Sequence, residues 1–507
     1  MNFFKTFLII FWAGIIFSAC KQESETTKTG YDKIVVNDST ITEAINRELK
    51  VDEQVASTNI EVTTENGIVL LDGTVNNLLA KNRAREIALM VKGVKGVLNQ
   101  IDVALQHVND REIEERINRK LRENEAVEFF EITASSDEGD VELTGAVNSW
   151  QEKEIANDIA MGTRGVKSVA NNISFVYEEG SRTPEGIKAD IKYRFRSDPL
   201  LDDANIEITV ENSTVILEGS VGSAWEKDKA EVDAMVAGVQ SVDASKLEVK
   251  SWRREEMFRK DKYVKIPDNE LKVAIENGLE LDPRVNEDNI SIMVDTGVVT
   301  LNGEVPTIYA KNAANEVAQA IIGVWDTENN LEVIPPGEIP GEKIKRQIME
   351  DIKWDSYLNN LDISVDVTGE TVIIEGTVNS RFEKRHVSNL ISRVKGVTKI
   401  ENNLNVKMDK TEEGSYSAIR PEGSLPLPEA ELKSDEEIKN DVMQHLFWSP
   451  YVNEEDVNVK VDDGIVTLTG IVETWQEKSM AEKDAYHGGA VSVNNEIEVI
   501  YDGEGQK

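Results

Sequence analysis

A stretch of alternating apolar and polar residues recurs six times along the chain. In VNVKVDDGIVTLTGIV (Val457–Val472), apolar residues fill every second position on both sides of an Asp463-Gly464 pair. This period of two places apolar side chains on one face of a strand, and an Asp-Gly pair favours a tight hairpin turn. The pattern therefore predicts six β-hairpins. The other five copies are IEVTTENGIVLLDGTV (Ile60–Val75), FEITASSDEGDVELTGAV (Phe130–Val147), IEITVENSTVILEGSV (Ile206–Val221), ISIMVDTGVVTLNGEV (Ile290–Val305) and ISVDVTGETVIIEGTV (Ile363–Val378).

Each predicted hairpin ends in a glycine that falls on the same face of the strand as the apolar residues. These glycines are Gly73, Gly145, Gly219, Gly303, Gly376 and Gly470. Because glycine has no Cβ, we expect each one to let a helix approach the sheet closely. This role is a matter of packing and requires no ligand.

Apolar residues with helical spacing precede every hairpin. Ile113, Ile117 and Leu121 are one such set, and a single stripe of this kind predicts a helix with one buried side. The helix starts are predicted at capping pairs and the ends before prolines. The starts are Thr40 with Glu43, Thr183 with Pro184 and Ser434 with Glu437, and the ends are Asp198-Pro199, Asp282-Pro283 and Ser449-Pro450. The other stripes are Ile41, Ile45, Leu49; Ile187, Ile191, Phe195; Leu271, Ile275, Leu279; Ile344, Ile348, Ile352; and Ile438, Val442, Leu446.

A second helix and a third strand follow each hairpin. The second helix is predicted to end at a glycine that acts as a left-handed cap, and words such as GVTKIENNLNV (Gly396–Val406) then read as a turn and a strand. The repeating unit is therefore α-β-β-α-β. The fold class is α+β, with six small tandem domains that each pack two helices on one face of a three-stranded sheet.

A longer period indicates that a block of three domains was duplicated. Gly73 recurs as Gly303, Gly145 as Gly376 and Gly219 as Gly470, at intervals of 230, 231 and 251 residues. The extra length of the last interval lies in a segment rich in proline, which we interpret as a linker. The predicted bounds are domains at 38–107, 108–178, 183–250, 267–335, 339–409 and 434–501, a joint at 251–266, the linker at 410–433 and a tail at 502–507.

The front of the chain is a targeting segment. Lys5 is followed by the apolar run Phe7–Phe17 and then by Ser18-Ala19-Cys20, and residues 21–37 read as a polar tether. Small residues directly before the only cysteine resemble a bacterial lipobox, so Cys20 is expected to carry the lipid of a lipoprotein. The alternative is an ordinary signal peptide that is cut near Ala19.

The charge of the chain restricts its partners. It has 56 Lys and Arg residues against 94 Asp and Glu residues, which gives a net charge of −38. Such a surface repels nucleic acid and anionic head groups over most of its area, and no nucleic-acid partner is expected.

The sequence offers no candidate for catalysis or for a cofactor. The four histidines, His107, His386, His445 and His487, occupy no equivalent positions in the repeats and lack partners at ligand spacing, so we expect no metal site. No phosphate-binding loop, H-E-x-x-H or G-x-S-x-G motif is present. We therefore expect a protein without enzymatic activity and without a cofactor.

The unit order, the hairpins that end in L-x-G and the G-V-x-x-V-x-N-x-I/L/V endings resemble the BON domain of bacterial osmotically induced periplasmic and nodulation proteins. Copies three and five depart at the turn, with Ser213 in place of glycine and an extra residue between Gly369 and Gly376. The resemblance implies an envelope protein without catalytic residues, associated with phospholipid binding, membrane integrity or osmotic stress tolerance.

Two features remain outside this framework. Aromatic residues open four second helices, either as a hydrophobic staple or as a contact to a neighbouring domain or ligand. They are Trp150, Trp225, Phe382 and Trp475. In the joint, KSWRREEMFRKDKYVK (Lys250–Lys265) carries seven basic and three acidic residues, either for contact with a membrane or partner or for salt bridges within the joint. The candidate contact residues are Trp252, Arg253, Arg254, Arg259 and Lys260.

Two hypotheses for function follow. The first is a lipoprotein of the bacterial envelope, held through Cys20 on the outer membrane and facing the periplasm, whose domains bind phospholipid head groups or envelope proteins. The second is a periplasmic holdase or adaptor, whose sheet edges and acidic surface engage client proteins.

Overall fold

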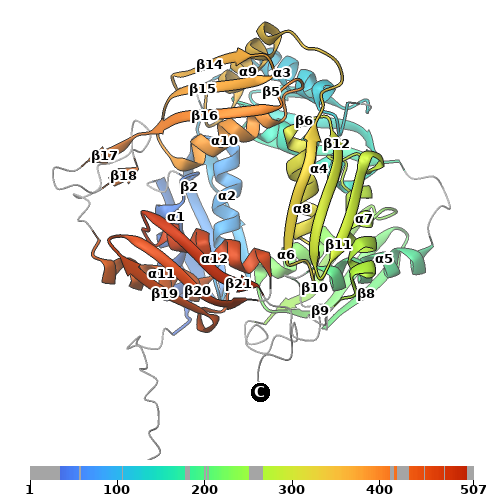
Figure 1. Cartoon of the computed structure of the whole chain (residues 1–507). Helices are drawn as coiled ribbons and strands as arrows, with labels where there is room; N and C mark the ends of the chain where they lie inside the picture. Colours follow the sequence, from blue (N-terminus) through green and yellow to red (C-terminus); the bar gives the residue numbers. More distant parts are fainter. Residues whose placement is uncertain are drawn as a thin grey trace, which may run out of the picture. The chain divides into compact units, whose positions relative to one another are not determined.

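The structure is a computed structural model that describes residues 35–55, 59–105, 107–128, 130–176, 183–198, 201, 205–250, 266–410, 416–418, 433–449, 452–472 and 474–499. Over these residues the chain forms six α+β domains of the predicted kind, numbered one to six in chain order. In each domain the two helices lie on the same face of a small sheet, as α7 and α8 do in domain four (Figure 1).

Every described domain repeats the same order of elements. The first helices are α1 (Asp38–Val51), α3 (Asp110–Glu123), α5 (Pro184–Ser197), α7 (Asp268–Glu280), α9 (Gly341–Trp354) and α11 (Asp435–Trp448). The hairpins are β1 (Ile60–Glu65) with β2 (Ile68–Val75), β5 (Thr133–Asp137) with β6 (Asp140–Val147), β8 (Ile206–Glu211) with β9 (Thr214–Val221), β11 (Ile290–Asp295) with β12 (Val298–Val305), β14 (Ile363–Thr368) with β15 (Thr371–Val378), and β19 (Val457–Asp462) with β20 (Ile465–Val472).

The second helix and the third strand complete each domain. The second helices are α2 (Leu78–Leu89), α4 (Trp150–Met161), α6 (Ala224–Asp233), α8 (Ile308–Gln319), α10 (Arg381–Ser392) and α12 (Trp475–His487). The third strands are β3 (Gly96–Asn99) with β4 (Asp102–Val103), β7 (Ser168–Phe175), β10 (Ser241–Val249), β13 (Asp326–Val333), β16 (Lys399–Val406) and β21 (Ser492–Val499). The short strands β17 (Met408–Lys410) and β18 (Tyr416–Ala418) pair after domain five.

The second hairpin strand lies at the centre of each sheet. In domain four, β12 pairs antiparallel with β11, with Ile290 opposite Gly303, and parallel with β13, with Val298 opposite Asp326. A parallel pair needs a crossover connection, and α8 supplies it.

Each domain buries its own core, and all six predicted helix stripes are buried. The core of domain four is built from α7 residues such as Ile275, sheet residues such as Leu301 and small residues of α8 such as Ala314. The core of domain five forms a separate cluster around Ile348 and Ile374. Each described domain therefore has a small core of its own, as the repeats predicted.

The hairpin glycines have a different role from the predicted one. Gly376 has a φ of +139°, and a Cβ on it would lie 2.4 Å from the carbonyl oxygen of Asp362, the residue before β14. The same geometry recurs in the other five domains, where a Cβ would lie 1.9–2.6 Å from a backbone oxygen. The glycine thus admits the neighbouring backbone of the hairpin, and the expectation that it admits a helix was wrong.

Two predicted helix ends also differ from the structure. The N-cap of α1 is Asn37, and Thr40 is the third helical residue, whose hydroxyl completes the capping box. In domains one to five the turn glycine lies beyond the helix cap, since α10 ends at Ser392 whereas the turn glycine is Gly396. In domain six the predicted left-handed glycine is present, since Gly489 directly follows the C-cap residue Gly488 and has a φ of +108°. The capping box of Ser434 with Glu437 and the Thr183-Pro184 start are confirmed.

Candidate functional site

The first residue of the first helix holds the hairpin turn in four of the domains. In domain two, Asp110 accepts the N–H groups of Glu138 and Gly139 at 3.0 and 2.9 Å and the hydroxyl of Ser136 at 2.8 Å. The hydrogen bond from Ser136, followed by that from Gly139, lowers the pKa of Asp110. Asp38, Asp268 and Asp435 make the same pair of bonds to their own turns. In domains three and five this position is Pro184 and Gly341, and these are the copies whose turns depart from the pattern.

The asparagine of the G-V-x-x-V-x-N-x-I/L/V motif connects the third strand to the second helix. In domain five, the side-chain amide of Asn402 donates to the carbonyl of Lys384 at 2.7 Å, and its oxygen accepts the N–H of Leu404 at 3.1 Å. Asn99, Asn171, Asn329 and Asn495 make the same bonds. The repeated polar residues therefore serve the architecture of each domain.

A third recurring contact joins the end of the first helix to the second helix. Its acidic partner is the C-cap residue, and its basic partner, an arginine, a lysine or a histidine, lies on the facing helix. The pairs are Arg83 with Asp52 at 2.9 Å, Lys229 with Asp198 at 2.5 Å and His386 with Asp355 at 2.8 Å. In domain six the corresponding residues are Ser449 and Met480, when helices are aligned at their N-caps and C-caps. Domain six thus lacks the cation that domain three has at this place.

This difference leaves a buried carboxylate in domain six. In domain three Asp233, four residues after Lys229, is held by the lysine ammonium at 2.7 and 2.8 Å. Asp484 is the corresponding residue of α12; it is buried, and its Oδ2 has no hydrogen-bond partner among the described residues. Burial, and secondly the charge of Glu48, raises the pKa of Asp484 to about 6, although His445 and His487 oppose that shift.

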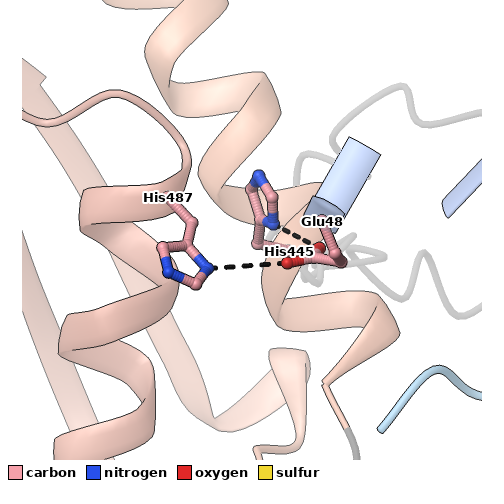
Figure 2. Close-up of side chains that lie close together, drawn as sticks. All are labelled: Glu48, His445 and His487. Atoms are coloured by element: carbon pink, nitrogen blue, oxygen red, sulfur yellow. Dashed lines mark hydrogen bonds and ion pairs between the residues drawn. The ribbon is translucent and has the colours of Figure 1, made fainter. Parts of the chain in front are cut away.

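Glu48, His445 and His487 lie together where domain one meets domain six. Figure 2 shows the two imidazoles of α11 and α12 facing the carboxylate of α1. Nδ1 of His445 lies 2.5 Å from Oε1 of Glu48, and Nδ1 of His487 lies 3.5 Å from Oε2. One nitrogen or oxygen atom from each residue lies within 4.8 Å of the other two. The Nδ1 atom of His487 is buried and makes no hydrogen bond within the described part of the chain.

The surroundings of this cluster favour charge on Glu48. Burial raises the pKa of Glu48, but the charge and hydrogen bond of His445, together with the nearby His487, outweigh burial and lower it to about 2. The cluster borders a cavity of about 40 Å³, which Asp484 and Lys483 also line. Both carboxylates and both imidazoles therefore converge on one small buried space.

Neighbouring contacts hold domains one and six against each other. The N–H of Lys92 donates to the carbonyl of Trp448 at 3.3 Å, and its ammonium lies 4.7 Å from the centre of the Phe447 ring. The cluster is therefore part of a wider contact between the first and the last domain.

Sequence reasoning did not indicate this cluster. His445 and His487 end the two helices of one domain, and the packing of α11 against α12 brings them together. That adjacency follows from the α-β-β-α-β pattern and was a usable signal. Glu48 belongs to domain one, and nothing in the repeat pattern indicates which domains meet.

Domains two and five meet through a second buried cluster of charges. The guanidinium of Arg116 contacts the carboxylate of Asp351, and Lys120 contacts the same carboxylate at 2.7 Å. Arg116 and Asp351 are only 3% and 4% exposed, so this is a desolvated charge pair between domains. Two backbone bonds support it, from Arg164 N–H to the carbonyl of Trp354 and from Ser356 N–H to the carbonyl of Gly162.

The site residues predicted from the sequence are Cys20 and five residues of the joint. Cys20 and the joint residues lie outside the described residues, so the predictions about them stay predictions. The joint residues are Trp252, Arg253, Arg254, Arg259 and Lys260.

The four aromatic residues occupy two different positions in their helices. Trp150 and Trp475 are the first residues of α4 and α12, whereas Trp225 and Phe382 are the second residues of α6 and α10. Trp150 packs against the core of domain three, which makes it a contact to a neighbouring domain. Phe382 instead stacks on His386 of its own domain, with ring centres 5.2 Å apart.

Comparison with known proteins agrees with this repeat architecture. The family model described as BON domain matches residues 37–104, 109–177, 184–251, 267–335, 341–408 and 434–501. The chain therefore belongs to the BON domain family, with six copies of the domain.

Individual relatives resemble about a third of the chain. Osmotically-inducible protein Y of Escherichia coli (strain K12) is 28% identical over 160 residues, which cover 30% of this chain and 78% of the relative. The outer membrane lipoprotein DolP of Haemophilus influenzae is 29% identical over 157 residues, which cover 30% of this chain and 79% of the relative. A solved structure of CdsD, a structural protein of the type III secretion system of Chlamydia trachomatis, covers 46% of this chain and 92% of its own, at 12% identity and a TM-score of only 0.12.

None of the helices in the described ranges combines the length and apolar character needed to cross a membrane.

Proposed function

We propose that this chain is a non-catalytic, lipid-anchored protein of the bacterial cell envelope, whose BON domains bind membrane phospholipid or envelope proteins and support envelope integrity or stress tolerance. The observation that carries the proposal is the use of the repeated polar residues. Asp110 and Asn402, and the residues that match them in the other domains, form hydrogen bonds with backbone groups of their own domain. Because these repeated residues stabilise the fold of each domain, we infer that partners are recognised by the surfaces of the domains and the joints between them.

The relatives support the location in the envelope. One is named an osmotically inducible protein and another an outer membrane lipoprotein. A lipid on Cys20 would hold this chain at a membrane, because each buried CH₂ group contributes about 0.8 kcal/mol and several acyl chains together give stable anchoring.

Replacing the lipidated residue tests the anchor. The full chain and its Cys20→Ser variant are produced in a bacterium that processes lipoproteins, and membranes are sedimented and extracted with detergent. The wild type is expected in the detergent-extracted membrane fraction and the variant in the soluble fraction. Equal sedimentation of both chains would contradict lipid anchoring.

Head-group binding is tested separately from anchoring. The chain without residues 1–20 contains every described residue, so its domains are intact. It is mixed with anionic and with neutral phospholipid vesicles at low salt, beside a variant in which Arg253, Arg254 and Arg259 are changed to Glu. We expect binding to anionic vesicles that weakens with salt and is lost in the variant. Absence of binding, together with suppression of a client protein's aggregation, would instead favour a holdase.

A further inference from the structure

We propose that Glu48, His445 and His487 form a binding site for a divalent transition metal ion of the zinc class, shared between domain one and domain six. Two imidazoles and one carboxylate are a ligand set that binds zinc with one position left open. The three ligand atoms come from α1, α11 and α12 and already lie within 4.8 Å of one another.

Two of the three ligand distances can be compared with those around a small tetrahedral ion, and the three ligand atoms, which lie within 4.8 Å of one another, must move to reach that arrangement. Zinc bonds of about 2.0–2.2 Å to nitrogen and oxygen place neighbouring tetrahedral ligands about 3.3 Å apart. His487 Nδ1 and Glu48 Oε2 are 3.5 Å apart, which is close to that spacing. His445 Nδ1 and Glu48 Oε1 are 2.5 Å apart, so these two side chains must separate by about 1 Å when an ion enters.

The comparison with domain three supplies an independent reason for a cation at this place. Asp233 of domain three is satisfied by Lys229, but the corresponding Asp484 has Met480 at the lysine position. Within the part of the chain that the structure describes, Oδ2 of Asp484 and Nδ1 of His487 are buried without hydrogen-bond partners, and the only ion-pair contact of His487 Nδ1 there is with Glu48 at 3.5 Å. Buried polar atoms are costly when unpaired, and a metal ion would give these atoms a partner directly or through a bound water.

The balance of charge favours a divalent ion. When both imidazoles bind a metal they are neutral, and the carboxyl groups of Glu48 and Asp484 then bring up to two negative charges to the space of about 40 Å³. Lys483 lines the same cavity and offsets one of them, whereas Arg83 is already paired with Asp52 and Glu86 at 2.9 and 3.0 Å. The site therefore retains negative charge for a cation to neutralise.

The site is expected once per chain. In the duplicated block the residues at the corresponding positions are Gly278, Arg194 and Val236, none of which binds a metal in this way. A bound ion would therefore tie the first domain to the last at one point only, and would couple metal availability to the contact between them.

Metal titration of the chain without residues 1–20 tests the proposal. The protein is freed of metal with a chelator, and ZnCl₂ or CoCl₂ is added at neutral pH while heat of binding and visible absorption are recorded. We expect saturation at a single equivalent and, with cobalt, the intense d–d bands of a four-coordinate site. Thermal unfolding of domains one and six is expected to shift upward with zinc.

Variants locate the ion. Glu48→Gln and His487→Gln change one ligand each at partly exposed positions and are expected to weaken zinc binding by more than roughly tenfold, since even loss of an outer partner of a ligand costs 10–100-fold. His386→Gln is the matched control, because His386 also faces a carboxylate at 2.8 Å but has no third ligand among the described residues. It is expected to bind zinc as the wild type does. Far-ultraviolet circular dichroism and the unfolding profile confirm that each variant is folded.

Three outcomes would overturn the proposal. The first is no saturable binding of either metal, and the second is equal binding by wild type, Glu48→Gln and His487→Gln, which would indicate an unrelated surface site. The third is binding that is weakened by His487→Gln but not by Glu48→Gln, because the ion would then lie within domain six and would not join the two domains.

Discussion

The hairpin glycines can be tested by one matched pair of substitutions in domain five. Gly376→Ala places a Cβ 2.4 Å from the carbonyl oxygen of Asp362 and 3.2 Å from Cα of Ile363, at a φ of +139°. Gly369→Ala, in the turn of the same hairpin, adds a Cβ at a φ of +62° with nothing within 4 Å. The pair thus separates backbone strain from collision with the neighbouring backbone.

The two substitutions are expected to differ in cost. A positive φ costs an L-residue about 1–2 kcal/mol, which is the whole expected effect of Gly369→Ala. In Gly376→Ala the strand must also move by about 1 Å to reach ordinary contact, and such overpacking costs a further 1–3 kcal/mol or so. We therefore expect Gly376→Ala to destabilise domain five by about 2–5 kcal/mol.

Hydrogen exchange followed by mass spectrometry measures this difference in the whole chain, where a single unfolding midpoint would mix six domains. Amides of β15 and β16 should exchange roughly 5- to 140-fold faster in Gly376→Ala than in Gly369→Ala, since the two differ by about 1–3 kcal/mol and 1.4 kcal/mol corresponds to tenfold. Peptides of domain two serve as an internal reference. If both variants raise exchange equally, the close approach of the backbone has no energetic consequence and the argument fails.

Three further substitutions test other contacts. Asp268→Ala removes the acceptor of the Thr296 and Gly297 N–H groups and is expected to destabilise domain four by about 2 kcal/mol. Hydrogen exchange should then be faster in β11 and β12. The control is Glu270→Ala at an exposed position in the same helical turn, and equal effects of the two substitutions would refute the role of Asp268. Arg116→Met leaves Asp351 buried with Lys120 alone and is expected to weaken the contact of domains two and five by about 3 kcal/mol. The double variant Arg116→Met with Asp351→Leu should lose less, because no unpaired charge stays buried. A double variant that loses as much as the single variant would show that the unpaired charge of Asp351 is not the cause of the loss. Burial, and then the charge of Asp158, raises the pKa of Glu154 to about 7. The folded domain then holds a proton that the unfolded chain releases near pH 4.5, so this stabilising contribution is lost as the pH rises through about 7. Glu154→Gln should therefore exceed the wild type in stability by roughly 1 kcal/mol at alkaline pH, after allowance for solvent screening, and should match it at acidic pH; a gain that is independent of pH would contradict the assignment.

Much of the fold follows from local patterns in the sequence. Residues such as Val457 and Val466 alternate because one face of a strand is buried, and Ile113 and Ile117 recur because one side of a helix is buried. These periods depend only on the element that contains them. The order of elements and the buried face of each one were therefore predictable.

The polar contacts between elements were harder to predict. The bonds from Asp110 to the turn at Gly139 span 29 residues, and no local rule connects them. The role of Gly376 was misjudged because its parity shows which face it lies on but not that the backbone of Asp362 occupies that face. The cluster of Glu48 with His445 and His487 depends on which domains meet, which the repeats do not encode.

The sheets of these domains also have a consequence for synthesis of the chain. In domain four, β11 and β13 are the outer strands, and each offers one unpaired backbone edge to a neighbour of almost the same length and spacing. Six similar hairpins emerging from one ribosome could exchange partners, because a foreign strand would fit the same register. Two features reduce that risk. A two-residue turn closes each hairpin early, and an outer strand such as β13 begins with the polar residues Asp-Thr-Glu-Asn-Asn. Replacing the exposed residues Asp326, Glu328 and Asn330 with valine, and keeping Asn329, should leave the purified protein folded yet lower its yield through misassembled chains.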